Sequence, residues 1–295
     1  MLWLYLALIA QFLNAAVILL DRFLVKSKTI QRPAVYAFYI SILSGVVIVF
    51  WPLGFVRQPT IEIMWLSVAI AIPYILSILF LYKSLKLAEA SDVAPVTGAV
   101  SALATFIFGF IFLKSGLPAN FFIGFILLVV GTALMSHLRL GGKSASYAMI
   151  SGVMFGLSSI FVKIIFTKTN FLDGFFWSRM ANVVGALMLL VWPDNFRAIK
   201  NSLLNSTRST KSLILVNKTL AGFAFLLILA AIKLGEVSLV NAMSGMQFVF
   251  LLLFALIFTK KMPQFFSETI HRHDVLWHKF ISTILIVLGF FVLFL

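Results

Sequence analysis

The sequence predicts an all-α polytopic membrane protein, with ten transmembrane helices arranged as two inverted five-helix repeats. The prediction rests on the apolar composition, on the length of the apolar runs and on an internal repetition. The 295-residue chain is 62% hydrophobic and only 11% charged, whereas soluble domains are about half apolar and about a quarter charged. A soluble fold of this size could not hide that much apolar surface, so lipid must surround most of it.

Apolar runs long enough to cross a bilayer occur throughout the chain. A membrane helix needs about 20 apolar residues. Segments such as Phe121–Leu134 and Phe248–Phe258 are apolar on every face, whereas the strands of a membrane barrel would alternate apolar and polar residues. The predicted spans lie near residues 2–20, 34–52, 64–82, 93–113, 120–137, 146–166, 172–192, 212–232, 237–258 and 278–295.

Two sequence motifs each occur twice, in the same order. Lys86–Ser91 (KLAEAS) resembles Lys233–Ser238 (KLGEVS), and each follows one apolar run and precedes another. Farther along, Phe108–Lys114 (FGFIFLK) matches residues 254–260 (FALIFTK). The spacing of these pairs indicates that the second half of the chain repeats the first.

The repeat divides the chain into residues 1–140 and 144–295, joined at Gly141–Lys143. Each half contains five predicted spans. Because five is odd, the second half must enter the membrane from the opposite side. Inverted repeats of this kind are typical of transporters, in which one half rocks against the other around a central site.

These features resemble the EamA-type permeases of the drug/metabolite transporter superfamily. The resemblance covers nearly the whole chain and rests on the five-plus-five layout, on Leu81–Ser91 with Pro95 following, on Ala230–Ser238 and on the helix style of Gly124–Gly131. It implies a permease or exporter of a small organic metabolite, with both termini in the cytoplasm.

The sequence departs from the pattern of that family at two places. The family often carries an arginine in its second and seventh helices. Arg179 fits the position in the seventh, but Phe38 and Tyr39 occupy the matching region of the second. Ala242 stands where the second half would match Pro95. These departures weaken any transfer of a particular member's substrate.

Two basic residues fall inside predicted spans, where charges are costly and usually functional. Arg179 lies in the seventh span, with Trp177 nearby and Asn182 one turn on, and Lys218 lies in the eighth. One interpretation is that they face a central cavity and bind an anionic or zwitterionic substrate. The other is that they extend to the interface or bond to helix ends. Lys163, near the end of its span, is expected to be interfacial.

Neutral polar residues recur at helical spacing in several other spans. They can line a cavity, and they are equally common as contacts between membrane helices. These further substrate-binding candidates are Gln11, Asn14, Tyr74, Ser77, Thr97, Ser101, Asn241, Ser244 and Gln247.

Charge and cysteine content narrow the partners. The chain has no cysteine and a formal net charge of +14. We interpret the basic excess as loops beside anionic lipid head groups, and we expect no nucleic-acid partner. Most Lys and Arg follow the odd-numbered spans, and basic residues favour the cytoplasmic side, which predicts both termini outside the cell membrane. No cofactor or metal is expected, and the chain is expected to be a monomer or homodimer.

The leading functional prediction is therefore a transporter that alternates access between its two halves for a small anionic or zwitterionic metabolite such as an amino acid. All nine acidic residues fall at span ends or in loops, which disfavours cationic cargo. A flippase for a lipid-linked sugar is the alternative within transport. A membrane-embedded lipid-modifying enzyme is the alternative outside it, but no convergent set of acid, base, nucleophile or metal ligands appears. We expect no enzymatic activity.

Overall fold

The protein is an all-α membrane protein. The computed structural model describes residues 2–26, 33–88, 90–114, 119–135, 140–205, 208–258 and 273–293, and every element in these ranges is helical. Seven helical segments of the described chain are long and apolar enough to cross a membrane, and three shorter apolar helices accompany them. Every predicted span overlaps one of these ten segments.

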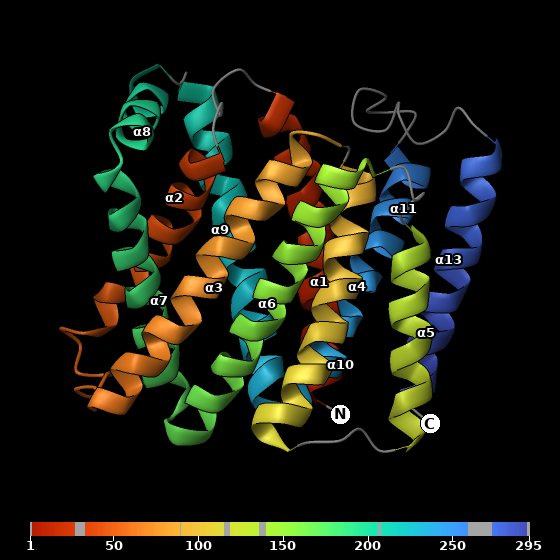
Figure 1. Cartoon of the computed structure of the whole chain (residues 1–295), viewed down its shortest axis with the longest axis horizontal. Coiled ribbons are helices and arrows are strands. Elements are labelled where there is room, and N and C mark those ends of the chain that lie inside the picture. The colour runs from red at the N-terminus through yellow and green to blue at the C-terminus, as the bar shows by residue number, and fades with distance from the viewer. Residues whose placement is uncertain are drawn as a thin grey trace.

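The helices stand side by side in a broad layer (Figure 1). Their bounds are α1 (Leu2–Lys26), α2 (Pro33–Leu43), α3 (Ile61–Leu85), α4 (Ala90–Phe108), α5 (Ala119–Met135), α6 (Gly142–Lys168), α7 (Phe171–Met188), α8 (Pro193–Asn205), α9 (Arg208–Leu234), α10 (Val237–Ala242), α11 (Met246–Phe258) and α13 (His273–Val292). Short 3-10 or π-helical segments extend some of them. The 3-10 segments are η1 (Ser44–Phe50), η3 (Leu189–Val191) and η4 (Met243–Gly245), and the π-helical segment is η2 (Gly109–Leu113). The start of α1 and the end of α13 lie at the lower edge of the layer in Figure 1.

Local sequence explains where individual helices begin. The Thr60 side chain accepts a hydrogen bond from the Ile63 amide at the start of α3, and Asn170 accepts one from the Asp173 amide at the start of α7. Such N-cap residues satisfy amides that have no partner within the helix. Pro193 occupies the first position of α8, where its fixed φ and missing N–H cost nothing.

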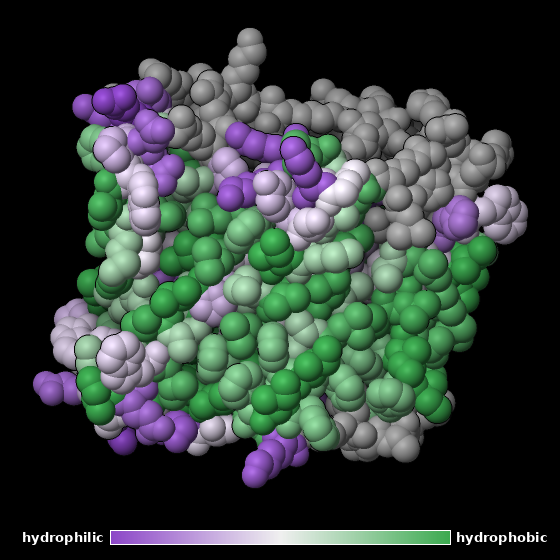
Figure 2. Space-filling view, in the orientation of Figure 1, coloured by the Kyte–Doolittle hydropathy of each residue, from purple (hydrophilic) through white to green (hydrophobic). Residues whose placement is uncertain are grey.

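The surface has the distribution expected of a protein in lipid. Figure 2 shows an apolar band across the middle of the layer, with hydrophilic residues gathered at its upper and lower edges. Large apolar side chains such as Val46, Trp65 and Phe110 are more than two-thirds exposed. A continuous apolar surface of this extent marks a membrane-facing region.

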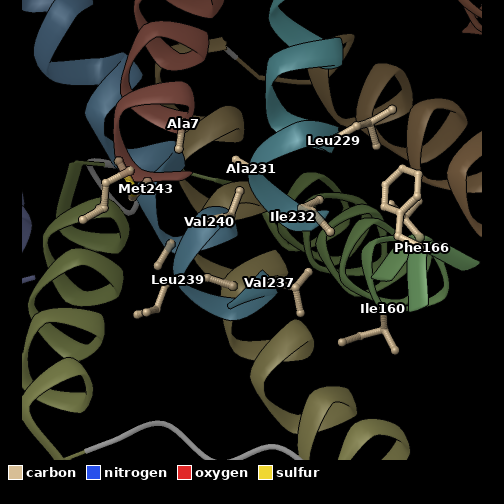
Figure 3. Packing of buried hydrophobic residues seen from close by; sticks show 14 of the residues in the cluster. Ala7, Ile160, Phe166, Leu229, Ala231, Ile232, Val237, Leu239, Val240 and Met243 are labelled. Atoms are coloured by element: carbon tan, nitrogen blue, oxygen red, sulfur yellow. The ribbon is translucent and has the colours of Figure 1, made fainter. Parts of the chain in front are cut away.

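Packing joins helices that are distant in sequence. α6 lies between α3 and α4, α1 packs along α9, and α5 packs along α13. Ala7 of α1, Phe166 of α6, Ile232 of α9 and Val240 of α10 meet in the largest buried cluster (Figure 3). This cluster ties the two halves of the chain together.

Small residues allow the backbones to approach closely. A Cβ atom added at Gly156 of α6 would lie 2.8 Å from the Ala104 Cβ and 2.9 Å from the Ser101 carbonyl oxygen of α4. Gly124 of α5 and Gly289 of α13 face each other, because a Cβ on either would lie 3.0 Å from the other's carbonyl oxygen. In lipid, where apolar burial does not drive helices together, such close van der Waals packing does.

One prediction from the sequence differs from the structure. The predicted spans 172–192 and 212–232 leave residues 193–211 as the connection between them. In the structure, α8 occupies most of this range. Its charged and amide residues give it too little hydropathy to be recognised as a span, and its 13 residues are too few to cross a bilayer.

The α4–α6 contact can be tested with two matched substitutions. We expect Gly156→Ala to lower stability by about 1–3 kcal/mol, because the added methyl group meets backbone atoms that cannot move aside cheaply. Gly222→Ala in α9 adds the same group where no atom lies within 4 Å, and its higher helix propensity favours the folded state by up to about 1 kcal/mol. Thermal unfolding of both variants in detergent checks this, and equal melting temperatures would contradict it.

Candidate functional site

A group of aromatic rings from four helices lies inside the helical layer. We call it the aromatic cluster, and it comprises Tyr36 of α2, Tyr74 and Tyr82 of α3, Phe155 of α6 and Phe225 of α9. The Tyr36 and Tyr82 rings are 4.0 Å apart, and the Tyr74 ring lies 6.1 Å from Phe155 and 5.9 Å from Phe225. These residues belong to one continuous buried contact group.

Arg179 of α7 rests against this cluster. Its guanidinium carbon lies 4.6 Å from the centroid of the Phe225 ring and 5.4 Å from that of Tyr74, distances at which a cation is attracted to an aromatic face. The residue is only 3% exposed. Its Nε and Nη2 atoms have no hydrogen-bond partner among the described residues, and no ion pair with Arg179 occurs in that part of the chain.

Two neutral polar side chains, one on α7 and one on the adjacent α2, are also buried without partners among the described residues. Asn182 lies three residues farther along α7, on the same face as Arg179, and neither its amide nitrogen nor its amide oxygen is hydrogen-bonded within the described chain. The same holds for the Ser41 hydroxyl of α2, which packs on α7. The neighbouring Ser44 hydroxyl donates to the Ser41 carbonyl oxygen at 2.6 Å and lies 3.5 Å from the Arg179 carbonyl oxygen.

Leaving such groups unsatisfied costs about 1–3 kcal/mol for each neutral group and more for a charged one. Native structures rarely accept this cost without a reason, which is often a bound ion, water or function. The set of Ser41, Arg179 and Asn182 offers both donors and acceptors. We call it the polar set, and its chemistry suits a small ligand that carries a carboxylate or phosphate together with a hydrogen-bond donor.

Lys218 of α9 reaches the other end of the aromatic cluster. Its ammonium group donates a hydrogen bond to the Tyr36 hydroxyl and lies 4.1 Å from the centroid of that ring. Lys218 and Phe225 are seven residues apart, which is two helical turns, or about 10 Å, on one face of α9. Since Phe225 contacts Arg179, the cluster carries one basic residue near each end.

Trp177 lies away from this site, although only one residue separates it from Arg179 in the sequence. Its indole N–H donates to the Arg57 carbonyl oxygen at 3.1 Å, and its ring contacts Trp51 at 5.4 Å. It lines a pocket of about 580 Å³ between the start of α3, the end of α6 and the start of α7. Asp173 also lines it, and accepts hydrogen bonds from the Arg57 amide at 2.9 Å and the Asn170 side chain at 2.7 Å.

The candidates on α4 and α10 lie at contacts between helices. The Asn241 side chain donates to the Thr105 hydroxyl at 2.7 Å, which in turn donates to the Ser101 carbonyl at 2.6 Å. The Thr97 hydroxyl bonds to the Val93 carbonyl within α4. Ser244 of η4 packs against Gly98, where an added Cβ would lie 2.8 Å from the serine oxygen. The bonds of Asn241, Thr105 and Thr97 favour the packing interpretation over the cavity interpretation, whereas the Ser244 hydroxyl is buried without a hydrogen-bond partner among the described residues.

The remaining candidates are distributed over three helices. Ser77 of α3 is buried and donates to the Tyr74 carbonyl oxygen at 2.6 Å. Gln11 and Asn14 bond to each other on α1 at 3.3 Å. Gln247 is half-buried on α11. Of the candidates named from the sequence, the structure therefore gathers Tyr74, Arg179, Asn182 and Lys218 at the aromatic cluster.

Several residues of this site were not found from the sequence. Phenylalanine occurs 32 times in the chain, so Phe155 and Phe225 do not stand out among membrane-facing rings. The sequence signal that could have assigned Phe225 to this site is its spacing from Lys218, since a separation of seven residues places both on one helical face.

Lys163 of α6, expected at the membrane interface, bonds instead to the end of α9. Its half-buried ammonium group donates to the carbonyl oxygens of Ile232, Lys233 and Gly235 at 2.8, 3.2 and 2.7 Å. A cation at a helix C-terminus satisfies exposed carbonyls and complements the helix dipole. Lys163 therefore fixes α6 to the α9–α10 junction.

Comparison with known proteins supports the fold. No protein-family model and no curated protein matches the sequence, but 27 solved chains match the structure. One crystal structure superimposes with a TM-score of 0.64 over 97% of both chains at 15% sequence identity. At that identity the similarity establishes a shared fold and nothing about activity. The chain belongs to the class of α-helical membrane proteins.

The role of Lys163 can be tested against a second lysine on the same helix. We expect Lys163→Gln to destabilise the protein by about 2–3 kcal/mol, because a neutral amide cannot satisfy three carbonyls and loses charge-assisted bonds. Lys168→Gln breaks a pair with Glu62 at 2.6 Å. Both side chains of that pair are largely exposed, so this change should cost less than about 1 kcal/mol. Thermal unfolding measures both, and an equal loss in the two variants would contradict the assignment.

Proposed function

We propose that this protein is a membrane transporter of the EamA type, in the drug/metabolite transporter superfamily. In this proposal the ten apolar helices are ten spans, and residues 1–140 and 144–295 form two inverted five-helix halves. The halves alternate access to a central site for a small organic anion or zwitterion, such as an amino acid. The protein resides in the cell membrane and acts without a cofactor.

The inverted arrangement is supported by the position of the repeated motif. The first copy follows α3 and the second follows α9. In Figure 1, α3 ends at the upper edge of the layer, whereas α9 runs downward to meet α10 near the lower edge. The two copies therefore lie at opposite edges, as two halves of opposite orientation require.

The observation that carries the proposal is the buried guanidinium of Arg179, whose Nε and Nη2 atoms have no hydrogen-bond partner among the described residues. Arg179 lies eight residues from the start of the segment Phe171–Val191, which places it about 12 Å along the helix axis. A charge at that depth is costly and usually marks a substrate or ion site. The planar fork of an arginine matches a carboxylate or phosphate with two parallel hydrogen bonds.

The neighbours of Arg179 complete a recognition site in this proposal. The Asn182 amide oxygen accepts a hydrogen bond from the ammonium or hydroxyl group of the cargo, and the rings of Tyr74 and Phe225 cover its apolar part. Lys218 provides a second positive charge about two helical turns away. From the charge distribution of the loops we infer that both termini lie outside, opposite to the orientation that the family resemblance implies.

The proposal can be tested by transport in proteoliposomes. A metabolite that thermally stabilises the purified protein is first selected from a library, since a ligand that binds only the folded state raises stability by mass action. We expect Arg179→Ala to reduce uptake of the selected metabolite by at least about tenfold. The reason is that the variant loses one charge-assisted interaction, which contributes about 1.5–3 kcal/mol. Arg179→Lys keeps the positive charge but loses the planar guanidinium, so its uptake should lie between that of the original protein and that of Arg179→Ala.

Lys143→Gln is the matched control, because it removes one positive charge from an exposed position and should leave uptake unchanged. The thermal stability of Arg179→Ala without cargo should equal or exceed that of the original protein, since an unpaired buried charge is removed. Unchanged uptake by a folded Arg179→Ala variant would refute the proposal. Movement of a lipid-linked sugar, rather than a soluble metabolite, would favour the flippase alternative.

A further inference from the structure

α8 is an amphipathic helix at one edge of the protein, and the transport proposal does not use it. It lies at the upper edge in Figure 1, beside α2 and the end of α7. Figure 2 shows hydrophilic residues at this corner directly above the apolar band. A short amphipathic helix at this level is typical of one that lies in the membrane interface.

The inner face of α8 is fixed to the protein. Ile199 is almost fully buried and packs with Val35 and Phe38 of α2 and with Ala186 of α7. Ser202, one turn farther on, is buried and accepts a hydrogen bond from the Tyr39 hydroxyl at 3.2 Å. α8 is therefore docked on α2 in a defined rotation about its own axis, and this rotation determines which residues it presents outward.

The outer face combines apolar and basic side chains. Phe196 is 49% exposed, and Trp192 just before the helix is 59% exposed. Arg197 and Lys200 are exposed, and neither makes an ion pair or hydrogen bond with the described residues. Phe196 and Lys200 are four residues apart and Arg197 and Lys200 three, so all three share one side of the helix.

We propose that α8 is a binding site for anionic phospholipid head groups. Phe196 and Trp192 insert at the boundary between head groups and acyl chains, and Arg197 and Lys200 bind lipid phosphates from the adjacent leaflet. Each basic residue at an anionic membrane surface contributes about 1 kcal/mol, and the apolar anchors hold the two charges at the phosphate level. The strongly basic chain, with a formal net charge of +14, is complementary to such a leaflet.

The absence of cysteine from the sequence allows a direct test. A single Asn201→Cys substitution on exposed α8 is labelled with a fluorophore, and the protein is reconstituted in vesicles of phosphatidylcholine and phosphatidylglycerol. Bromine on the acyl chains of one lipid or the other quenches the label according to how often that lipid is its neighbour.

At equal mole fractions we expect phosphatidylglycerol to be about thirtyfold enriched at the label, because two basic contacts together contribute about 2 kcal/mol. The double substitution Arg197→Gln and Lys200→Gln should abolish this enrichment, so that the two lipids quench the label equally. The control pair Arg57→Gln and Lys114→Gln removes the same net charge from connections at the opposite edge and should keep the enrichment.

Three outcomes would overturn the proposal. The first is equal quenching by the two lipids in the protein with unaltered α8. The second is an enrichment that is lost equally in the control pair, since it would then reflect net charge rather than a site. The third is a label that neither lipid quenches, which would place α8 outside the interface and favour an acidic protein partner.

Discussion

The buried guanidinium of Arg179 is the feature on which the account of this protein depends. A cation within a membrane-spanning helix loses its hydration, and its attraction to the rings of Tyr74 and Phe225 returns only part of that free energy. The helices around it fix its position, because α2 and η1 pack along α7 and bring the Ser44 hydroxyl to 3.5 Å from the Arg179 carbonyl oxygen. The fold thus keeps a costly group in place, and two of its nitrogen atoms have no hydrogen-bond partner in the part of the chain that the structure describes.

The other basic residues inside the layer show why Arg179 is unusual. Lys163 satisfies its charge with three carbonyl oxygens at the end of α9, and Lys218 donates to the Tyr36 hydroxyl. These contacts within the protein explain why Lys163 and Lys218 lie inside the layer, without the need for a bound cargo. The polar set of Ser41, Arg179 and Asn182 has no such account, because buried polar groups in native proteins are nearly always hydrogen-bonded. In the transport proposal, a cargo that carries negative charge supplies the missing partner.

Hydropathy was sufficient to predict the helical class and the approximate bounds of the apolar helices, because the cost of unpaired backbone groups in lipid leaves few alternatives. It could not find α8, whose stability comes from docking Ile199 on α2 rather than from its own composition. Polar spacing also could not separate function from packing. Asn241 and Asn182 look alike in sequence, yet the first bonds to Thr105 of α4, while the second has no hydrogen-bond partner within the described ranges. That difference is set by contacts between distant helices.

The central claim is that the polar set lines the route of the cargo, so Asn182 must meet water during the transport cycle. The most direct measurement is the reaction of an Asn182→Cys variant, in this otherwise cysteine-free chain, with a membrane-impermeant anionic thiol reagent applied to either side of sealed vesicles. Thr105→Cys, at the packed α4–α10 contact, is the reference. The account predicts that position 182 reacts from at least one side, much faster than position 105, and that the cargo slows the reaction. Equal and negligible reaction at both positions would contradict it.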